Sequence, residues 1–346
     1  MPDTVGQLGE FEIIERMAAR YSATWVATQD EIGAVASESG IGDDCAVVRF
    51  GDTPVLLASD MLVEGRHFQR TYVEPSALGF KALAVNVSDV AAMGGRPAHA
   101  LVSLSLPAEL EVHVVDGIVD GLAEAAETFG VAIVGGDTTS GDAIVIDVAV
   151  TGLLPAGRAV ARAGACPGDV LCVTGALGGS HAGLRVLLAH GVGVPVDVRD
   201  AEVLVHRHQR PVPRVEGGVA AAESGVTAMI DVSDGLLADV GHIAKRSGVS
   251  VDVTSERVPV EDGVAEVARA FGFDALASAL SGGEDYELAM TVPPERLDAV
   301  RTAVEAFEVP LSVIGAVGEG SGVTVDGATP QVSSAGWDHF RASEQR

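Results

Sequence analysis

Lysine is scarce in this chain of 346 residues, and acidic residues greatly outnumber basic ones. Only Lys81 and Lys245 are lysines, and 22 basic residues stand against 49 acidic ones, which gives a formal net charge of −27. Such a surface repels nucleic acid and anionic membranes, so we expect neither as a partner. A protein of this charge that handles phosphate compounds needs metal ions, backbone amides and a few arginines to bind them.

Cysteine pairs, membrane spans and common phosphate motifs are also missing. Cys45, Cys166 and Cys172 are an odd set without metal-ligand spacing, which predicts a reduced, cytoplasmic setting. No run approaches the roughly 20 apolar residues of a membrane helix, and the acidic N-terminal residues do not resemble a signal peptide. The chain has no G-x-x-x-x-G-K-[ST] phosphate loop. His206 and His208 are two residues apart in a helical stretch, so their side chains diverge and we expect exposed surface positions.

Two α/β domains are predicted, residues 1–155 and 156–346. The chain is longer than the roughly 300 residues at which a single core stops growing. Strand and helix patterns alternate throughout, and the small, Gly- and Pro-marked segment 155–168 is the best boundary. In the first half, one helix is expected to begin at Pro75 and another to end at Gly130. One strand is expected to end at Asp60 and another to run into a loop around Asp137.

Aspartates with glycine or hydroxyl neighbours recur along the chain, mostly where an apolar strand is expected to end. In α/β folds the carboxyl ends of strands are where ligands bind. Each aspartate alone is better explained as a helix cap or a turn residue. If these aspartates met in one site without cations, their negative charges would repel one another strongly. The set therefore predicts a site for several Mg²⁺ ions, whose coordination the substrate phosphates would complete. The clusters are Asp43-Asp44, Ser59-Asp60, Ser88-Asp89, Asp137 in "GGDTTSGD", and Asp231, Ser233 and Asp234 in "IDVSDG".

Six segments together resemble the thiamine-monophosphate kinase family. This family belongs to the ATP-using superfamily that includes aminoimidazole ribonucleotide synthetase. The resemblance extends from about Gly9 to Phe340, and "EGRHF" with "GWDHF" narrows it from the superfamily to the kinase. The segments are, in order, "GIGDDCAVV", "SDMLVEGRHF", "KALAVNVSDVAAMGG", "VGGDTTSGD", "DVSDGLLADVGHIAK" and "SGGEDYELAMTV".

The resemblance implies a fold and a reaction. The expected fold is a PurM-like N-terminal domain, whose strands form a β-barrel across a homodimer, followed by a C-terminal α/β domain, with the active site between domains. The expected reaction is direct transfer of the γ-phosphoryl group of ATP to thiamine monophosphate, which yields thiamine diphosphate and ADP and completes thiamine diphosphate biosynthesis. Several Mg²⁺ ions take part, and a need for K⁺ stays open. The acceptor phosphate has a second pKa near 6, so a general base is not required.

The resemblance also assigns roles to residues of this sequence. Asp43 matches less securely than Asp44, and Ala58 stands where family members can carry a hydroxyl. For Arg162 a surface position in a linker is the alternative. Asp44, Asp89, Asp137 and Asp234 are the expected catalytic residues. The expected metal ligands are Asp44, Ser59, Asp60, Asp89, Asp137, Asp231 and Asp234, and the expected ATP contacts are Gly136, Asp137, Arg162 and Ser233.

His67, Glu284 and Trp337 match the family's substrate-binding positions. A tryptophan face suits a flat cationic heterocycle through cation–π attraction. Each has a structural alternative: Trp337 closing the core, His67 as a buried neutral hydrogen-bonding group, and Glu284 as a turn residue beside Asp285. Two rival functions also stay open. One is a sibling ATP-dependent synthetase, and the other is a sensor that binds ATP and Mg²⁺ without turnover.

Overall fold

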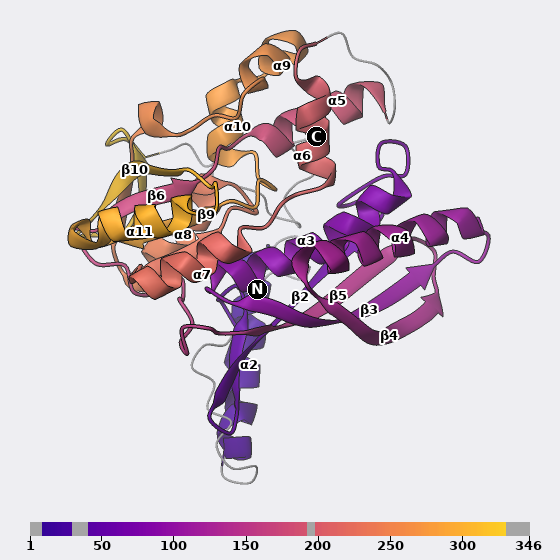
Figure 1. Cartoon of the computed structure of the whole chain (residues 1–346), viewed down its shortest axis with the longest axis horizontal. Helices are drawn as coiled ribbons and strands as arrows, with labels where there is room; N and C mark the ends of the chain where they lie inside the picture. Colours follow the sequence, from indigo (N-terminus) through magenta and orange to yellow (C-terminus); the bar gives the residue numbers. More distant parts are fainter. Residues whose placement is uncertain (1–8, 30–40, 192–197, 330–346) are drawn as a thin grey trace.

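The N-terminal half forms a mixed five-stranded sheet in the computed structural model, which describes residues 9–29, 41–191 and 198–329 (Figure 1). Neighbouring strands are antiparallel except β3 and β4, which run parallel. Because most neighbouring strands run in opposite directions, their carboxyl ends are divided between the two ends of the sheet and do not all meet at one edge. The order is β1 (Ala46–Phe50), β2 (Thr53–Val63), β5 (Val145–Leu153), β3 (Arg96–Leu106) and β4 (Ala132–Ser140).

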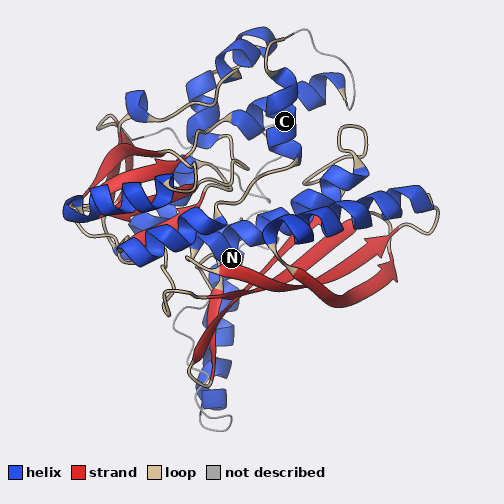
Figure 2. Ribbon diagram, in the orientation of Figure 1, coloured by secondary structure: helices blue, strands red, loops and turns tan. Residues whose placement is uncertain are grey.

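Two helices, α3 (Pro75–Ala92) and α4 (Val112–Phe129), lie along one face of this sheet (Figures 1 and 2). They approach closely because glycines line their contact: a Cβ on Gly79 would lie 2.0 Å from the carbonyl oxygen of Ile118. The predicted start of α3 at Pro75 is confirmed, as is the end of α4 at Gly130, which has a φ of 69°.

The opposite face of the same sheet is open in the described chain and carries large apolar side chains. Leu57 and Met61 of β2 are 38% and 50% exposed, Leu101 of β3 is 49% exposed, and Leu153 of β5 is 50% exposed. Strand register places these residues on one face, because Leu101 and Ser59 both pair with Ala149 while their neighbours alternate to the helical side. Exposed large apolar side chains on one sheet face are typical of an interaction surface.

The C-terminal half forms a six-stranded sheet whose core is separate from the first. Its order is β11 (Gly322–Val325), β8 (Ser250–Val253), β10 (Leu311–Gly318), β6 (Val170–Thr174), β9 (Leu288–Val292) and β7 (Ala228–Asp231). The helices around it are α5 (Gly179–His190), α6 (Ala201–Gln209), α7 (Val215–Ser224), α8 (Leu236–Ser247), α9 (Val264–Phe271), α10 (Ala275–Ser281) and α11 (Leu297–Glu305), with short 3₁₀ turns at Ser255–Arg257 and Pro294–Arg296. Before the first sheet, helix α2 (Glu10–Gln29) projects from the body (Figure 1).

Helix α3 also packs against the C-terminal half. A Cβ on Gly218 of α7 would lie 2.1 Å from the carbonyl oxygen of Ala91, so the two helices meet at backbone distance. Fifteen residues of α3 are buried, far more than a helix with one solvent face allows. This central position lets polar residues of α3 reach the ends of strands in the second sheet.

The α/β composition predicted for both halves is confirmed, but two strand boundaries are wrong. Strand β2 continues past Asp60 to Val63, and β4 includes Asp137 and extends to Ser140. Pairing explains both extensions, because Met61 to Val63 pair along β5 and the second half of β4 pairs with β3. Strand β3 and helices α7 and α10 were not predicted. No helix in the described ranges has the length and apolar content needed to cross a membrane.

Candidate active site

Three predicted metal ligands from distant parts of the sequence meet between the two halves. Asp44 precedes β1, Asp89 lies on α3, and Asp231 is the last residue of β7. One carboxylate oxygen from each of the three lies within 4.8 Å of the others. The packing of α3 between both sheets creates this meeting, since no pair of these residues is close in the sequence.

The chemistry of these three carboxylates fits a cation. Within the described residues, Oδ2 of Asp44 and Oδ1 of Asp231 are the buried side-chain oxygens without a hydrogen-bond partner. Burial and the Asp44 charge raise the pKa of Asp231 to about 8, and burial with the charges of Asp60 and Asp231 raises that of Asp89 well above its usual range. Buried carboxylates that repel one another and keep unpaired oxygens are the hard ligands that Mg²⁺ takes.

Arg162 lies at the edge of this cluster and is mostly buried. Its Nη2 and Nε donate to Oδ1 of Asp44 at 2.6 and 3.2 Å, and its backbone N–H donates to Oδ1 of Asp43 at 2.7 Å. Burial opposes its charge, but the neighbouring Asp44 and Asp231 outweigh burial and raise the arginine pKa. The structure therefore excludes an exposed linker position for Arg162. Asp43, predicted only loosely, holds the backbone of this arginine.

Ser59 and Asp60 are adjacent in β2 and so point to opposite faces of the sheet. The backbone N–H of Asp60 donates to Oδ1 of Asn86 on α3 at 2.9 Å, and its charge raises the pKa of Asp89. Asp60 is thus near the three carboxylates without being one of the group within 4.8 Å. Ser59 faces the open side, where its Oγ donates to Asp147 at 3.1 Å.

Gly136 and Asp137 lie on β4, at the far edge of the sheet from β1. Asp137 pairs with Ser103 of β3, and three inter-strand steps separate β4 from β2, which is roughly 14 Å at about 4.8 Å per step. Within one chain, Asp137 therefore lies too far from Asp60 to share a cation with it. Gly136 cannot be another residue, because a Cβ there would lie 1.7 Å from the carbonyl oxygen of Val102.

Ser233 and Asp234 occupy the turn between β7 and α8. Asp239, on the first turns of α8, accepts hydrogen bonds from the backbone N–H groups of Ser233 and Gly235 at 3.1 and 3.0 Å. Asp234 is mostly buried, and burial with the charge of Glu10 raises its pKa to about 7. Asp239 was not predicted as a functional residue, although an acid in the first turn of a helix is favoured by the helix dipole.

The predicted acceptor residues His67 and Glu284 are electrostatic neighbours, because the Glu284 pKa is lowered mainly by Lys81 and to a smaller extent by His67. Nδ1 of His67 accepts a hydrogen bond from the backbone N–H of Val63 at 2.9 Å, which fixes the ring against the end of β2. Trp337 lies outside the described residues.

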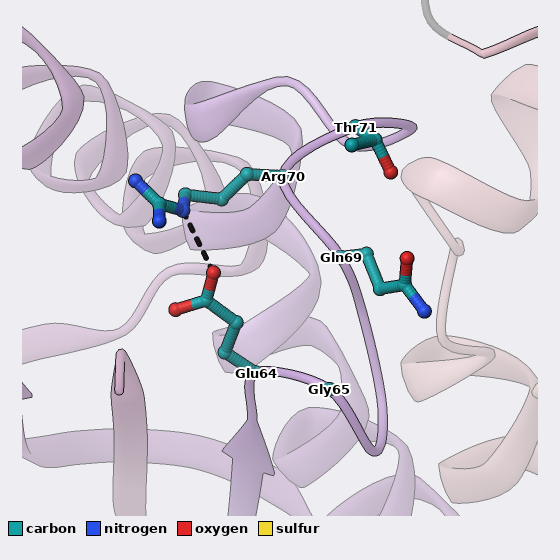
Figure 3. Close-up of a pocket in the computed structure, with 5 residues that line it drawn as sticks. All are labelled: Glu64, Gly65, Gln69, Arg70 and Thr71. Carbon is teal, nitrogen blue, oxygen red and sulfur yellow. Dashed lines mark hydrogen bonds and ion pairs between the residues drawn. The ribbon is translucent and has the colours of Figure 1, made fainter. Parts of the chain in front are cut away.

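A pocket of about 400 Å³ opens at the loop that follows β2 and is lined by Glu64, Gly65, Gln69, Arg70 and Thr71 (Figure 3). Arg70 and Glu64 form an ion pair of 2.7 Å at its rim, while Gln69 and Thr71 project to the other side of the loop. Oε2 of Glu64 also accepts a hydrogen bond from the backbone of Ile144, which ties the loop to the start of β5. The loop that carries His67 is therefore held by its own charged residues.

The prediction that the two histidines are exposed is wrong for His208. His206 is exposed, but His208 is 2% exposed and burial lowers its pKa to about 3. The two rings do diverge, and α6 packs against the rest of the protein on the side of His208. Lys81 is likewise buried, with 7% of its surface exposed, and it was not predicted as a site residue.

Comparisons with known proteins identify the family of this chain. Residues 42–154 match the domain family described as AIR synthase related protein, N-terminal domain, and residues 166–327 match the corresponding C-terminal domain. The thiamine-monophosphate kinase of Aquifex aeolicus is 40% identical over 301 residues, which cover 87% of this chain and 92% of that protein. This chain belongs to the thiamine-monophosphate kinase family.

A further relative and a solved structure support this assignment. The Salmonella typhimurium kinase is 39% identical over 336 residues, 96% of this chain and 98% of that protein. The solved structure of AaThiL complexed with AMPPCP and TMP covers 98% of this chain and 100% of that chain, with a TM-score of 0.84 and 37% identity.

Proposed function

We propose that this protein phosphorylates thiamine monophosphate with ATP and releases thiamine diphosphate and ADP. The observation that carries the proposal is the meeting of Asp44, Asp89 and Asp231, with two buried and unpaired oxygens, in a chain of the thiamine-monophosphate kinase family. The AaThiL structure holds AMPPCP and TMP, an ATP analogue and the acceptor, on a closely similar fold.

Most of the predicted residues have a proposed task in this reaction, whereas Ser59 is bonded to Asp147 on the open sheet face and is assigned none. Asp44, Asp60, Asp89, Asp231 and Asp234 would hold Mg²⁺. When bound, the ions supply positive charge that offsets the repulsion between donor and acceptor phosphates. Arg162 orients the Asp44 carboxylate and adds a fixed guanidinium next to the nucleotide site. Ser233 and Gly136 offer backbone and hydroxyl contacts to ATP, while His67, Glu284 and Trp337 bind the acceptor. Transfer is direct, because the acceptor phosphate is already a nucleophile at neutral pH.

A homodimer is part of the proposal, because the open sheet face and the position of Asp137 both support it. The apolar side chains of β2, β3 and β5 would be covered by the same face of a second copy, which forms a closed barrel. Asp137 and Ser59 lie on that open face, on different strands of one protomer. Across a dimer, Asp137 of one copy would complete the metal site of the other.

Two further predictions concern the domain boundary and the redox setting of the protein. We place the domain boundary at residue 155, between β5 and β6, so that the domains are residues 1–155 and 156–346. Cys45, Cys166 and Cys172 are free, which supports a reduced, cytoplasmic setting.

The deciding experiment is to incubate purified protein with ATP, Mg²⁺ and thiamine monophosphate and to separate the products by chromatography. We expect thiamine diphosphate and ADP in equal amounts, and neither product in EDTA or without acceptor. ADP formed without thiamine diphosphate would favour a sibling synthetase. ATP binding without any turnover would favour a sensor.

A further inference from the structure

One of the two lysines of this acidic chain is buried between the two halves of the protein. Lys81 extends from α3, and its Nζ lies 2.9 Å from Oε1 of Glu284, in the segment between α10 and β9. The Lys81 side chain is 8% exposed, whereas that of Glu284 is 32% exposed. The lysine is therefore enclosed, whereas the glutamate side chain stays partly accessible.

Helix α6 also contributes a side chain to the contact between Lys81 and Glu284. His208 of α6 places its Nδ1 3.4 Å from Oε2 of Glu284 and 3.0 Å from Oγ of Ser180. Burial and the nearby Lys81 charge lower the His208 pKa to about 3, so the ring is neutral at physiological pH. Lys81 is thus the cation that balances Glu284. Burial by itself would raise the Glu284 pKa, but Lys81 reverses the direction of the shift.

The backbone holds Glu284 in an unusual conformation at this point. Its φ is 58°, a left-handed value that non-glycine residues seldom adopt, and its N–H donates to the carbonyl oxygen of Ser233 at 2.7 Å. Tyr286 has a φ of 53° and donates to Val232 at 2.9 Å. Such strain persists where a side chain has a specific task. The result is a glutamate whose backbone is bonded to the β7–α8 turn that carries Ser233, while its side chain contacts Lys81.

We propose that Lys81 is a positioning residue for the acceptor: from the N-terminal half it fixes the Glu284 carboxylate of the C-terminal half in the orientation that binds the cationic rings of thiamine monophosphate. This inference rests on the proposed function and extends it to a residue without a known contact to substrate. A buried ion pair stabilises a fold no better than apolar residues of similar size. Stability alone therefore does not explain why Lys81 and Glu284 form this pair.

The test is a double-mutant cycle of Lys81→Met and Glu284→Gln, with Lys245→Met as the matched control. Lys245 is the other lysine, and its ion pair with Glu15 on the surface leaves it 69% exposed. We expect Lys81→Met to raise the KM for thiamine monophosphate by about 10- to 100-fold, as for the loss of a charged hydrogen bond, while kcat and the KM for ATP change less than about threefold.

The double-mutant cycle distinguishes a positioning role of Lys81 from a general loss of stability. If Lys81 acts through Glu284, the double variant should have the acceptor KM of Glu284→Gln alone, and its melting temperature should recover relative to Lys81→Met. An unchanged acceptor KM in Lys81→Met, or effects that multiply in the double variant, would overturn the proposal. Wild-type protein without turnover would refute the proposed function instead, and calorimetric binding of thiamine monophosphate to the same variants would still test Lys81.

Discussion

Two nitrogens of Arg162 donate to the same carboxylate oxygen of Asp44, and the other oxygen of that carboxylate is buried without a partner. The Asp44 side chain is completely inaccessible to solvent. One oxygen of the carboxylate therefore fixes its orientation, and the other has no partner in a carboxylate that is grouped with Asp89 and Asp231. This division is what a metal ligand needs, because a ligand oxygen must be held in place yet have a lone pair to offer.

Replacing Asp44 by Asn should abolish phosphoryl transfer while preserving the fold. The amide oxygen still accepts from Arg162, but the charge that holds a cation is gone, so we expect kcat to fall at least about 100-fold. The gain in melting temperature that Mg²⁺ gives the wild type should also disappear. Asp52→Asn, at an exposed turn, is the control and should behave as wild type. Near-full activity of Asp44→Asn would remove Asp44 from the metal site.

Mixing two inactive variants tests whether Asp137 acts across the dimer. In a dimer of Asp44→Asn with Asp137→Asn, one site would contain both substitutions and the other would be intact. Random exchange makes half of the dimers mixed, so about a quarter of wild-type activity should return. Activity is measured after co-refolding or co-expression, with each variant alone as the control. If Asp137 serves the site of its own chain, no activity returns.

A charge on the open sheet face should prevent dimer formation. Leu101 is 49% exposed in the middle of that face, and Leu101→Glu would place facing carboxylates inside the proposed barrel. We expect a folded monomer in light scattering and a large loss of activity. Phe307→Glu, at a site 46% exposed in the C-terminal half, should leave the mass unchanged. A dimeric Leu101→Glu protein would place the interface elsewhere.

His208 should make the protein sensitive to acid. Its folded-state pKa of about 3 lies below the unfolded value of 6.5, so the unfolded chain binds the proton first and stability falls as pH drops from 6.5 toward 3. Between pH 7.5 and pH 5 this group alone costs about 2 kcal/mol, at about 1.4 kcal/mol per pH unit.

Urea unfolding at both pH values checks this expectation. His208→Gln should lose about 2 kcal/mol less on acidification than wild type. His206→Gln, on the exposed side of the same helix, should lose as much as wild type. Equal losses in His208→Gln and wild type would mean that another group governs acid stability.

Local sequence signals were sufficient for much of the secondary structure. Pro75 and Gly130 bound helices as predicted, because their backbone preferences act without help from the rest of the chain. Strand ends at Asp60 and Asp137 were wrong because a strand stops where its partner stops, and the partners β5 and β3 are distant in sequence. The polar residues in those strands looked like loop signals, yet Ser59 and Asp137 lie on the open sheet face and Asp60 faces α3.

The sequence by itself determined the chemistry of this protein, through its many aspartates, its scarcity of lysine and its family motifs. Tertiary structure decided which of those groups meet. It gathered Asp44, Asp89 and Asp231, left Asp137 on a separate face, and paired buried Lys81 with Glu284. The reason is that side-chain type is local, whereas burial and distance depend on how α3 packs between two sheets. Lys81 and His208 seemed unremarkable in the sequence because only packing removes them from water.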